Sequence, residues 1–281
     1  MYDNKKSCLA TLLLYHRKLL SYDIITLRYG CDQCAKIRFI EVKMRLNKYI
    51  ASCGICSRRE ADKLIEEKRI TIGGVVAECG AQVDEDDIVC LDGKEIRPKT
   101  EKIVLAYYKP VGVVCTENDV HAEKTVIEDI GYKERVTYAG RLDKDSEGLL
   151  IMSNDGELIN SMMKAANMHE KEYIVTVDKD VTDEFIKKMS SGIFLHELGI
   201  RTRRCNVKKT GKRSFDIILT QGLNRQIRRM CGELGYEVVK LKRIRVMTVK
   251  LDDYNLKPGE YAELSGDEKA LLYGKAGLKL I

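Results

Sequence analysis

The chain has 281 residues, of which 44% are hydrophobic, enough to bury a sizeable core and to divide into two domains. Its ten cysteines are spread along the chain with no secretory signal before them, and the apolar run at 9–15 is cut off by charges before it reaches membrane-spanning length. These features argue against a disulfide scaffold and a membrane protein, and predict a cytoplasmic location. The net charge of +6 permits nucleic-acid binding without requiring it.

Residues 1–43 show no sustained periodicity, no clear helix caps and no repeat, whereas local signals agree with one another from Met44 onward. Two explanations are open: an N-terminal extension, or translation that starts at Met44. We favour the second as a hypothesis. Mass spectrometry of the native N-terminus distinguishes them, since a peptide from residues 1–43 contradicts the late start.

Residues 44–98 have the pattern of a compact module made of two helices followed by small strands. Apolar residues recur at helical spacing from Leu46 to Cys53 and indicate a first helix. A capping-box pattern at 57–60 begins a second helix. Glycine-containing turn signals at 73–74 and 92–93 then separate short apolar segments, which predicts hairpins.

This module resembles the S4 RNA-binding domain in the segments Arg45-Leu46-Asn47-Lys48-Tyr49-Ile50 and Ser57-Arg58-Arg59-Glu60-Ala61. Charged runs on a helix are most often only solvated faces. Here the resemblance favours RNA binding instead, through basic side chains that avoid the apolar stripe and can face phosphates. These residues are Lys48, Arg58, Arg59 and Lys63.

Residues 99–266 follow a charged linker and mix strand signals with helix signals. The strand candidates lie at 103–108, 148–152, 173–177, 215–220 and 237–241, and the helix candidates at 157–164, 183–191 and 225–234. Hairpin-like turns with scattered helices predict an α+β protein: a small α/β module followed by a mixed, mainly antiparallel domain. We assign residues 267–281 to a C-terminal tail.

Three carboxylates, Asp143, Asp145 and Glu147, lie just before the apolar run at 149–152. The segment would suit a solvated turn, a calcium loop or a catalytic carboxylate. It matches the first half of an EF-hand loop, but position twelve is Asn154 rather than a bidentate carboxylate, and a strand-like run replaces the second helix. Calcium is therefore rejected, and the other two alternatives stay open from the residues alone.

The whole segment Gly140-Arg141-Leu142-Asp143-Lys144-Asp145-Ser146-Glu147-Gly148-Leu149 is similar to the signature of the RsuA and RluB/E/F pseudouridine synthases. Further motifs of that family follow its order at 109–112, 171–173 and 222–230, and the resemblance is strongest to the RluF-like branch. It covers residues 44–266 and implies isomerisation of a uridine to pseudouridine in ribosomal RNA, specifically 23S. A target in 16S or transfer RNA, or a non-catalytic S4-type ribosome factor, are the alternatives.

The resemblance also implies roles for individual residues. Asp143 would be the nucleophile, attacking C1′ of the ribose or C6 of the base, between which the sequence does not choose. Tyr173 would stack on the flipped base, although an aromatic at such a position is otherwise an ordinary strand residue. Arg228 would pair with Asp143. The RNA-holding residues would be Arg141, Asn224, Arg225 and Arg229. The chemistry needs no metal or nucleotide cofactor, and we expect a monomer.

Two Cys-x₂-Cys pairs, Cys31 with Cys34 and Cys53 with Cys56, have the spacing of a four-cysteine zinc site. Cys53 lies on the apolar stripe of its helix, and Cys56 just precedes the next helix, so packing explains both without metal. We therefore expect no zinc. A zinc-to-protein ratio near one would contradict this expectation.

Overall fold

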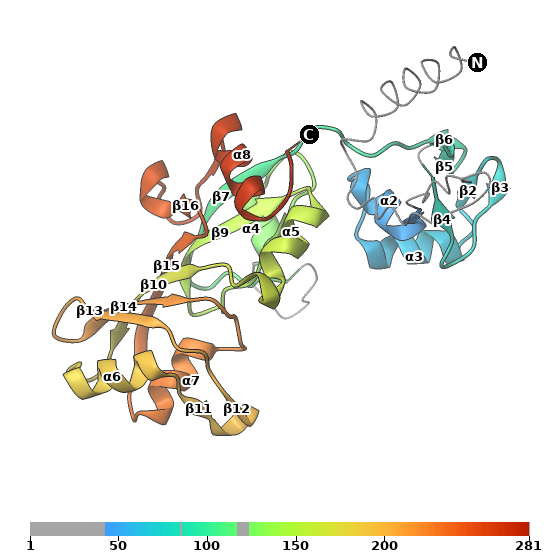
Figure 1. Cartoon of the computed structure of the whole chain (residues 1–281). Coiled ribbons are helices and arrows are strands. Elements are labelled where there is room, and N and C mark those ends of the chain that lie inside the picture. Colours follow the sequence, from blue (N-terminus) through green and yellow to red (C-terminus); the bar gives the residue numbers. More distant parts are fainter. Residues whose placement is uncertain (1–42, 85, 117–123, 281) are drawn as a thin grey trace, which may run out of the picture. The chain divides into compact units, whose positions relative to one another are not determined.

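The computed structural model describes residues 43–84, 86–116 and 124–280 (Figure 1). The expectations for residues 1–42, including the Cys31 and Cys34 pair, lie outside this range. The module at 44–98 and the larger domain that follows are described separately below.

The N-terminal module contains the two predicted helices, α2 (Leu46–Ser52) and α3 (Arg58–Glu66). Helix α3 begins with the predicted capping box, in which the Ser57 hydroxyl accepts from the Glu60 amide and the Glu60 carboxylate accepts from the Ser57 amide. Small strands complete the module: β1 (Met44–Arg45) paired with β4 (Gln82–Val83), and a sheet in the order β3 (Val75–Val76), β2 (Ile70–Ile72), β5 (Val89–Leu91), β6 (Lys94–Glu95).

Both predicted hairpins of this module are confirmed. The turn at 73–74 joins β2 to β3, and the turn at Asp92 and Gly93 joins β5 to β6. Asp92 and Gly93 both have positive φ, as the tight two-residue turn requires. Leu46, Ile50 and Ile65 from the helices are buried in the core beneath the strands.

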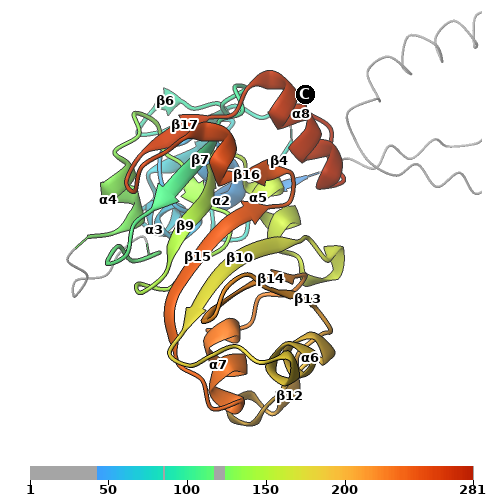
Figure 2. The same cartoon turned by 90° about the vertical axis from the view of Figure 1, so that its left-hand side faces the viewer.

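The larger domain is built on a nine-stranded sheet in which the described strands pair antiparallel with one exception (Figure 2). The order along the sheet is β13 (Asn206–Lys209), β14 (Ser214–Leu219), β10 (Lys171–Val177), β15 (Val238–Val246), β9 (Glu147–Ser153), β7 (Val104–Lys109), β17 (Tyr261–Glu263). Strand β16 (Val249–Lys250) pairs with β15, and β8 (Thr137–Tyr138) with β9. The exception is the parallel pair β9 and β15, which joins the two halves of the sheet.

Helices cover different faces of the two half-sheets. Alternate residues of β7 and β9 pack on one face against α5 (Gly156–Met163) and α8 (Gly266–Lys275), and on the other against α4 (Val126–Ile130). The half-sheet of β10, β13 and β14 packs against α6 (Asp183–Ser191) and α7 (Gln226–Glu233). Short elements complete the domain: η2 (Ala165–Asn167), β11 (Phe194–Leu195), η3 (His196–Leu198), β12 (Ile200–Arg201) and η4 (Leu251–Tyr254).

The C-terminal segment differs from its assignment as a tail, because helix α8 occupies Gly266–Lys275. A capping box between Ser265 and Glu268 begins the helix, and Leu272 and Tyr273 are buried in the core. The Tyr273 hydroxyl donates a 2.8 Å hydrogen bond to Asp155. The capping pattern was present in the sequence, but the helix is short and its apolar residues do not form a sustained stripe.

Candidate active site

The acidic segment forms a loop between β8 and β9 that is held to the end of β7. Within the loop, the Ser146 amide donates to the Asp143 carbonyl at 3.1 Å, which makes a tight turn. The Gly112 amide donates to the Lys144 carbonyl at 2.8 Å. These bonds fix the backbone on both sides of the Asp143 side chain, which remains 27% exposed.

Lys109 fastens this loop from beneath. Its side chain is fully buried, and its ammonium group donates to the carbonyls of Pro110 and Ser146, both at 2.8 Å. Burial lowers the pKa of Lys109, because a charged amine is costly to remove from water. The two carbonyls offset part of that cost and bind the Asp143 loop to the 109–112 motif. The sequence singled out this motif only by resemblance and gave Lys109 no role.

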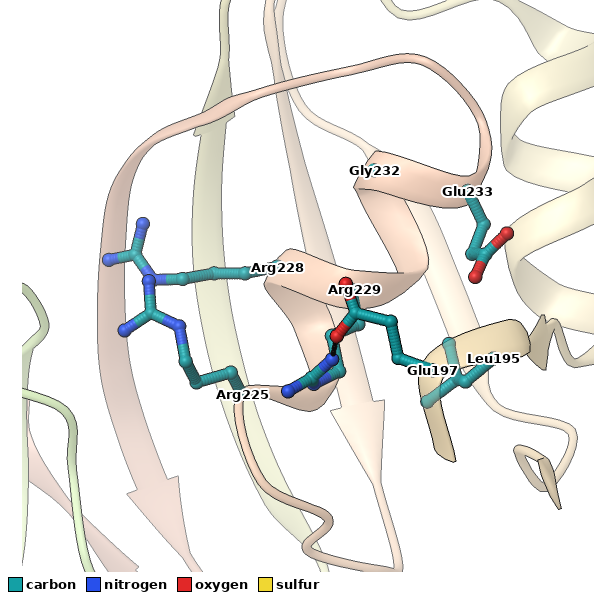
Figure 3. Close-up of a pocket in the computed structure, with 7 residues that line it drawn as sticks. All are labelled: Leu195, Glu197, Arg225, Arg228, Arg229, Gly232 and Glu233. Atoms are coloured by element: carbon teal, nitrogen blue, oxygen red, sulfur yellow. Dashed lines mark ion pairs between the residues drawn. The ribbon is translucent and has the colours of Figure 1, made fainter. Parts of the chain in front are cut away.

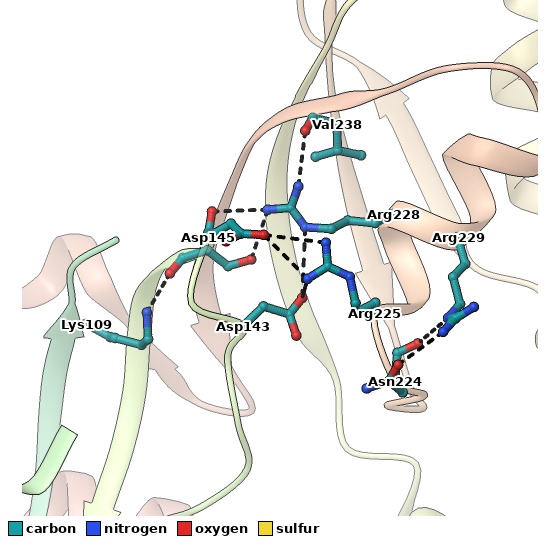
Figure 4. A network of polar contacts seen from close by, with 9 residues as sticks. Lys109, Asp143, Asp145, Asn224, Arg225, Arg228, Arg229 and Val238 are labelled. Carbon is teal, nitrogen blue, oxygen red and sulfur yellow. Dashed lines mark hydrogen bonds and ion pairs between the residues drawn. The ribbon is translucent and has the colours of Figure 1, made fainter. Parts of the chain in front are cut away.

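Two arginines of the α7 segment reach the carboxylates of the loop (Figure 4). Arg228 Nε lies 3.9 Å from Asp143 Oδ2, and Arg225 Nη1 lies 3.7 Å from the same oxygen. Arg225 also contacts Asp145 at 3.4 Å. The structure therefore brings Asp143 and Arg228 together, as the family resemblance implied, and gives Asp145 a partner in Arg225.

Arg228 is oriented mainly by main-chain carbonyls. Its guanidinium donates to the Val238 carbonyl at 3.1 Å and to the Asp145 carbonyl at 3.0 Å, and its side chain is 15% exposed. Its Nε is buried and makes no hydrogen bond within the described residues, so this edge of the group is turned to Asp143 by charge alone. A planar guanidinium with several fixed donors suits this task better than a flexible amine.

Tyr173 lies on β10, opposite Arg243 of β15 and one strand away from the junction of β15 with β9. It is partly buried and packs against both the cluster under α7 and the cluster under α4. The second cluster includes Leu142, which immediately precedes Asp143. Tyr173 is thus placed beside the loop of the predicted nucleophile, with its ring on the face of the sheet that carries that loop.

The seam between the half-sheets is unusually close at Gly148 and Arg243, which pair across β9 and β15. Gly148 has φ +111°, and a Cβ there would lie 2.2 Å from the Arg243 carbonyl oxygen. Arg243 is only 1% exposed; its Nε donates to the Leu149 carbonyl at 2.7 Å and its Nη1 contacts the Arg141 carbonyl at 3.4 Å. The arginine therefore supports the loop that carries Asp143.

Comparison with known proteins decides the family. Residues 103–233 match the family model described as RNA pseudouridylate synthase, and residues 44–89 match the S4 domain. The chain is 47% identical over 227 residues to the dual-specificity RNA pseudouridine synthase RluF of Escherichia coli K12, an alignment covering 80% of the chain and 77% of that protein. The chain belongs to the RNA pseudouridine synthases.

Other similar proteins agree with this assignment. The synthase is 34% identical to the ribosomal large subunit pseudouridine synthase B of Vibrio cholerae, over 78% of the chain and 71% of that protein. It is 37% identical to an uncharacterized RNA pseudouridine synthase of Aquifex aeolicus, over 80% of the chain and 94% of that protein. A crystal structure of a pseudouridylate synthase superposes with a TM-score of 0.61 at 27% identity, covering 82% of the chain and 99% of that structure. The predicted family and fold class are confirmed.

The residues predicted to hold RNA in the synthase fall into two groups. Arg58, Arg59 and Lys63 are exposed on α3, and Arg141 is exposed beside the catalytic loop. By contrast, Arg229 is committed to internal contacts. Its guanidinium donates to the Asn224 carbonyl at 3.0 Å and to the Asn224 side chain at 3.3 Å, and pairs with Glu197. Asn224 and Arg229 therefore brace the loop before α7.

A pocket of about 530 Å³ opens beside these arginines (Figure 3). It lies between α7 and the segment of β11 and η3, and it shares Arg225 and Arg228 with the Asp143 cluster. The other lining residues are Leu195, Glu197, Arg229, Gly232 and Glu233. The lining thus combines three arginines with two glutamates, of which Glu197 pairs with Arg229.

Two other basic residues of β15 make contacts within the domain, whereas Lys240 on the same strand is exposed. Lys242 lies over the Tyr108 ring with its amine 4.9 Å from the centroid. Arg245 pairs with Glu172 at 2.7 Å and with Glu170 at 3.0 Å. Lys242 and Arg245 thus support the domain from within and do not form a free basic surface.

Within residues 43–84, 86–116 and 124–280, no group of three or more potential ligands lies close enough to hold a metal ion. Burial raises the pKa of the Cys53 thiol to about 12 and raises that of Cys56, which disfavours the thiolates that zinc binds. In that same part of the chain, no helix has the length and hydropathy needed to cross a bilayer.

Proposed function

We propose that this synthase isomerises one specific uridine of large-subunit ribosomal RNA, using Asp143 as its nucleophile. The observation that carries the proposal is the half-buried Asp143 carboxylate beside the guanidinium groups of Arg225 and Arg228, on a loop fixed by Lys109. The choice of large-subunit RNA is supported by the RluF and large-subunit synthase relatives. We place the reaction in the cytoplasm, carried out by a monomer.

The chemistry follows from the groups present. Asp143 attacks C1′ or C6, the N1–C1′ bond breaks, and its electron pair stays with the uracil ring. The ring turns and C5 bonds to C1′, and the bond to Asp143 breaks and restores its carboxylate. The proton on C5 is then lost and N1 gains one. Atoms and electrons balance within the nucleotide, so the reaction needs no oxidant or reductant. Arg228 pairs with the carboxylate and orients it, and Tyr173 stacks on the ring and shields it from water.

The target uridine must leave its stack to reach Asp143, at a cost of a few kcal/mol. Phosphate contacts contribute the binding energy that offsets this cost, and we assign them to Lys48, Arg58, Arg59 and Lys63 of the S4 module and to Arg141 and Arg225 beside the site. Ribosomal RNA is recognised by its shape and its phosphates. A uridine in a loop or a distorted stem leaves its stack at lower cost, so we expect the target there.

The test compares Asp143→Asn with the matched variant Asp145→Asn on 23S ribosomal RNA, both naked and assembled. We expect Asp143→Asn to abolish pseudouridine formation while RNA affinity stays within about threefold, and Asp145→Asn to retain activity within about tenfold. Pseudouridine mapping in a deletion strain identifies the uridine, including any in 16S or transfer RNA. If the wild-type protein binds ribosomal RNA but forms no pseudouridine on any RNA, it is a binding factor and the proposal is wrong.

A further inference from the structure

Two cations lie on the sheet face next to Tyr173 and have no part in the mechanism above. Lys171 precedes Tyr173 by two residues on β10, so the two side chains leave the same face of the strand. Arg243 lies directly opposite Tyr173 on β15. Three side chains from neighbouring strands are thus grouped at the seam: an aromatic ring flanked by an amine and a guanidinium.

Neither cation has a carboxylate partner among the residues that the structure describes. Arg243 Nη2 is buried and makes no hydrogen bond there, because the other donors of this group are used on carbonyls. Lys171 is half-buried, and within the same part of the chain its amine makes no hydrogen bond or ion pair. Glu172 cannot reach this face, since it leaves the opposite face of β10 and pairs with Arg245.

The residues around Lys171 do not offset this excess of positive charge. On β14, the residues opposite Lys171 and Tyr173 are the apolar Leu219 and Ile217. Burial and the charge of Arg243 lower the pKa of Lys171 to about 8. His169, just before the strand, adds no negative charge, and the pKa of its ring is itself lowered by burial and by Lys171. Such a site lacks an anion, and binding one would relieve the repulsion.

We propose that Lys171 binds the detached uracil ring, and that Lys171 together with the buried charge of Arg243 stabilises the negative charge of the ring during the isomerisation. This inference rests on the proposed function. When the N1–C1′ bond breaks, the ring carries the electron pair, and the charge spreads onto its carbonyl oxygens until C5 bonds to C1′. Fixed donors aimed at charge that develops only during the reaction accelerate it more than contacts to the neutral substrate do.

An anionic oxygen could also come from a phosphate of the flipped nucleotide. The position beside Tyr173 favours the ring, because the residue that stacks on the base sets the base plane next to Lys171 and opposite Arg243. Lys171 is also half-buried beside apolar residues of β14, whereas phosphates are strongly hydrated and suit the exposed Arg141 and Arg225. The two sources predict different measurements.

The experiment compares Lys171→Met and Lys171→Arg with Lys208→Met, a control lysine that is exposed on β13 opposite Asp216. Single-turnover rates at saturating enzyme are measured on the RNA that the wild-type protein modifies. RNA affinity and its salt dependence are measured in the Asp143→Asn background. We expect Lys171→Met to lower the rate about 10²-fold with affinity within about threefold, and Lys208→Met to match wild type.

The pH profile of kcat/KM supplies a second readout. We expect the wild-type value to fall as the pH rises through about 8, where Lys171 loses its proton in the free enzyme. Lys171→Arg should retain most activity and lack this limb at higher pH, and Lys171→Met should be slow and lack it as well. This readout remains valid if the methionine variant folds poorly by circular dichroism.

The outcomes separate the ideas. An unchanged single-turnover rate in Lys171→Met overturns the uracil site. So does a loss confined to affinity, with the salt slope reduced by about one, because that pattern identifies a phosphate contact. A wild-type protein that forms no pseudouridine instead refutes the proposed function itself, before either lysine variant is compared.

Discussion

The backbones of Gly148 and Arg243 lie very close together where β9 pairs with β15. This close approach can be tested by adding one methyl group. In Gly148→Ala the new Cβ would lie 2.2 Å from the Arg243 carbonyl oxygen and 2.7 Å from its amide nitrogen, far inside van der Waals contact. The atoms it meets are backbone, so no flexible side chain can move aside. The residue would also have to keep φ +111°, which L side chains rarely adopt.

Both effects can be given a magnitude. Backbone strain of this kind costs about 1–3 kcal/mol, and overpacking in a closed core costs about another 1–3 kcal/mol. The variant should therefore lose about 2–6 kcal/mol of unfolding free energy, which for a domain of this size lowers Tm by roughly 4–24 °C. The backbone of β9 must move away from β15, so the Asp143 loop shifts relative to Arg228 and the rate should fall more than about tenfold at a temperature where the variant is folded.

The assay is thermal unfolding followed by circular dichroism, with the single-turnover rate measured well below the transition. Gly156→Ala is the matched control, because Gly156 is at the start of α5 and a Cβ there meets nothing within 4 Å. That substitution should be neutral or stabilising by up to about 1 kcal/mol. If Gly148→Ala and Gly156→Ala unfold at the same temperature as wild type, the seam is not closed as described and the reasoning is refuted.

Three further predictions concern charge. Arg228→Lys should lower the single-turnover rate about 10²-fold while RNA affinity changes less than about threefold, because an amine cannot replace the bonds to two carbonyls and still face Asp143; an unchanged rate would contradict the role of that guanidinium. Arg58→Ala and Lys63→Ala on α3 should each weaken RNA binding and reduce the salt slope by about one without changing the rate at saturation, and a salt titration that gives parallel lines would contradict phosphate contact. The fold disfavours the charged form of Lys171, so the penalty is complete below its folded pKa of about 8 and disappears as the pH rises toward the unfolded pKa of 10.5. Urea unfolding should therefore show the stability of wild type relative to Lys171→Met growing by about 2 kcal/mol from about pH 7 to about pH 9.5, and a difference that shrinks would contradict this sign.

Features set by neighbouring residues were predictable from the sequence. The capping box at Ser57 and the hairpin at Asp92 and Gly93 appear where they were predicted, since each depends on a few adjacent residues. Helix α6 has the predicted bounds, Asp183–Ser191, because Thr182 caps it and a clear apolar stripe follows. Recognition of the family added what local patterns could not: the pairing of Asp143 with Arg228, which are far apart in the chain.

The features that were not predictable depend on contacts between distant segments. Strand β15 is longer than predicted, because Lys242 and Arg245 interrupt its apolar alternation, and their partners lie on other strands. Arg243 looked like one more surface charge, yet it is buried at the seam. Lys109 also gave no local sign that it fastens the catalytic loop. Whether a long basic side chain is buried depends on the main-chain carbonyls that surround it in the fold. Its neighbours in the sequence do not show where those carbonyls lie.

The seam explains why so many of the cations here are internal. Asp143 comes from the loop before β9, whereas Arg228 comes from α7, which packs on the other half-sheet. Their mutual position therefore depends on how β9 meets β15, and that junction has a single short parallel pairing. Arg243 strengthens it by bonding across to Leu149 and Arg141, and Lys109 ties the loop back to β7. Lys109 and Arg243 thus hold the Asp143 loop through main-chain carbonyls. A carboxylate partner in their place would cancel their charge, whereas the carbonyls leave that positive charge beside the proposed site.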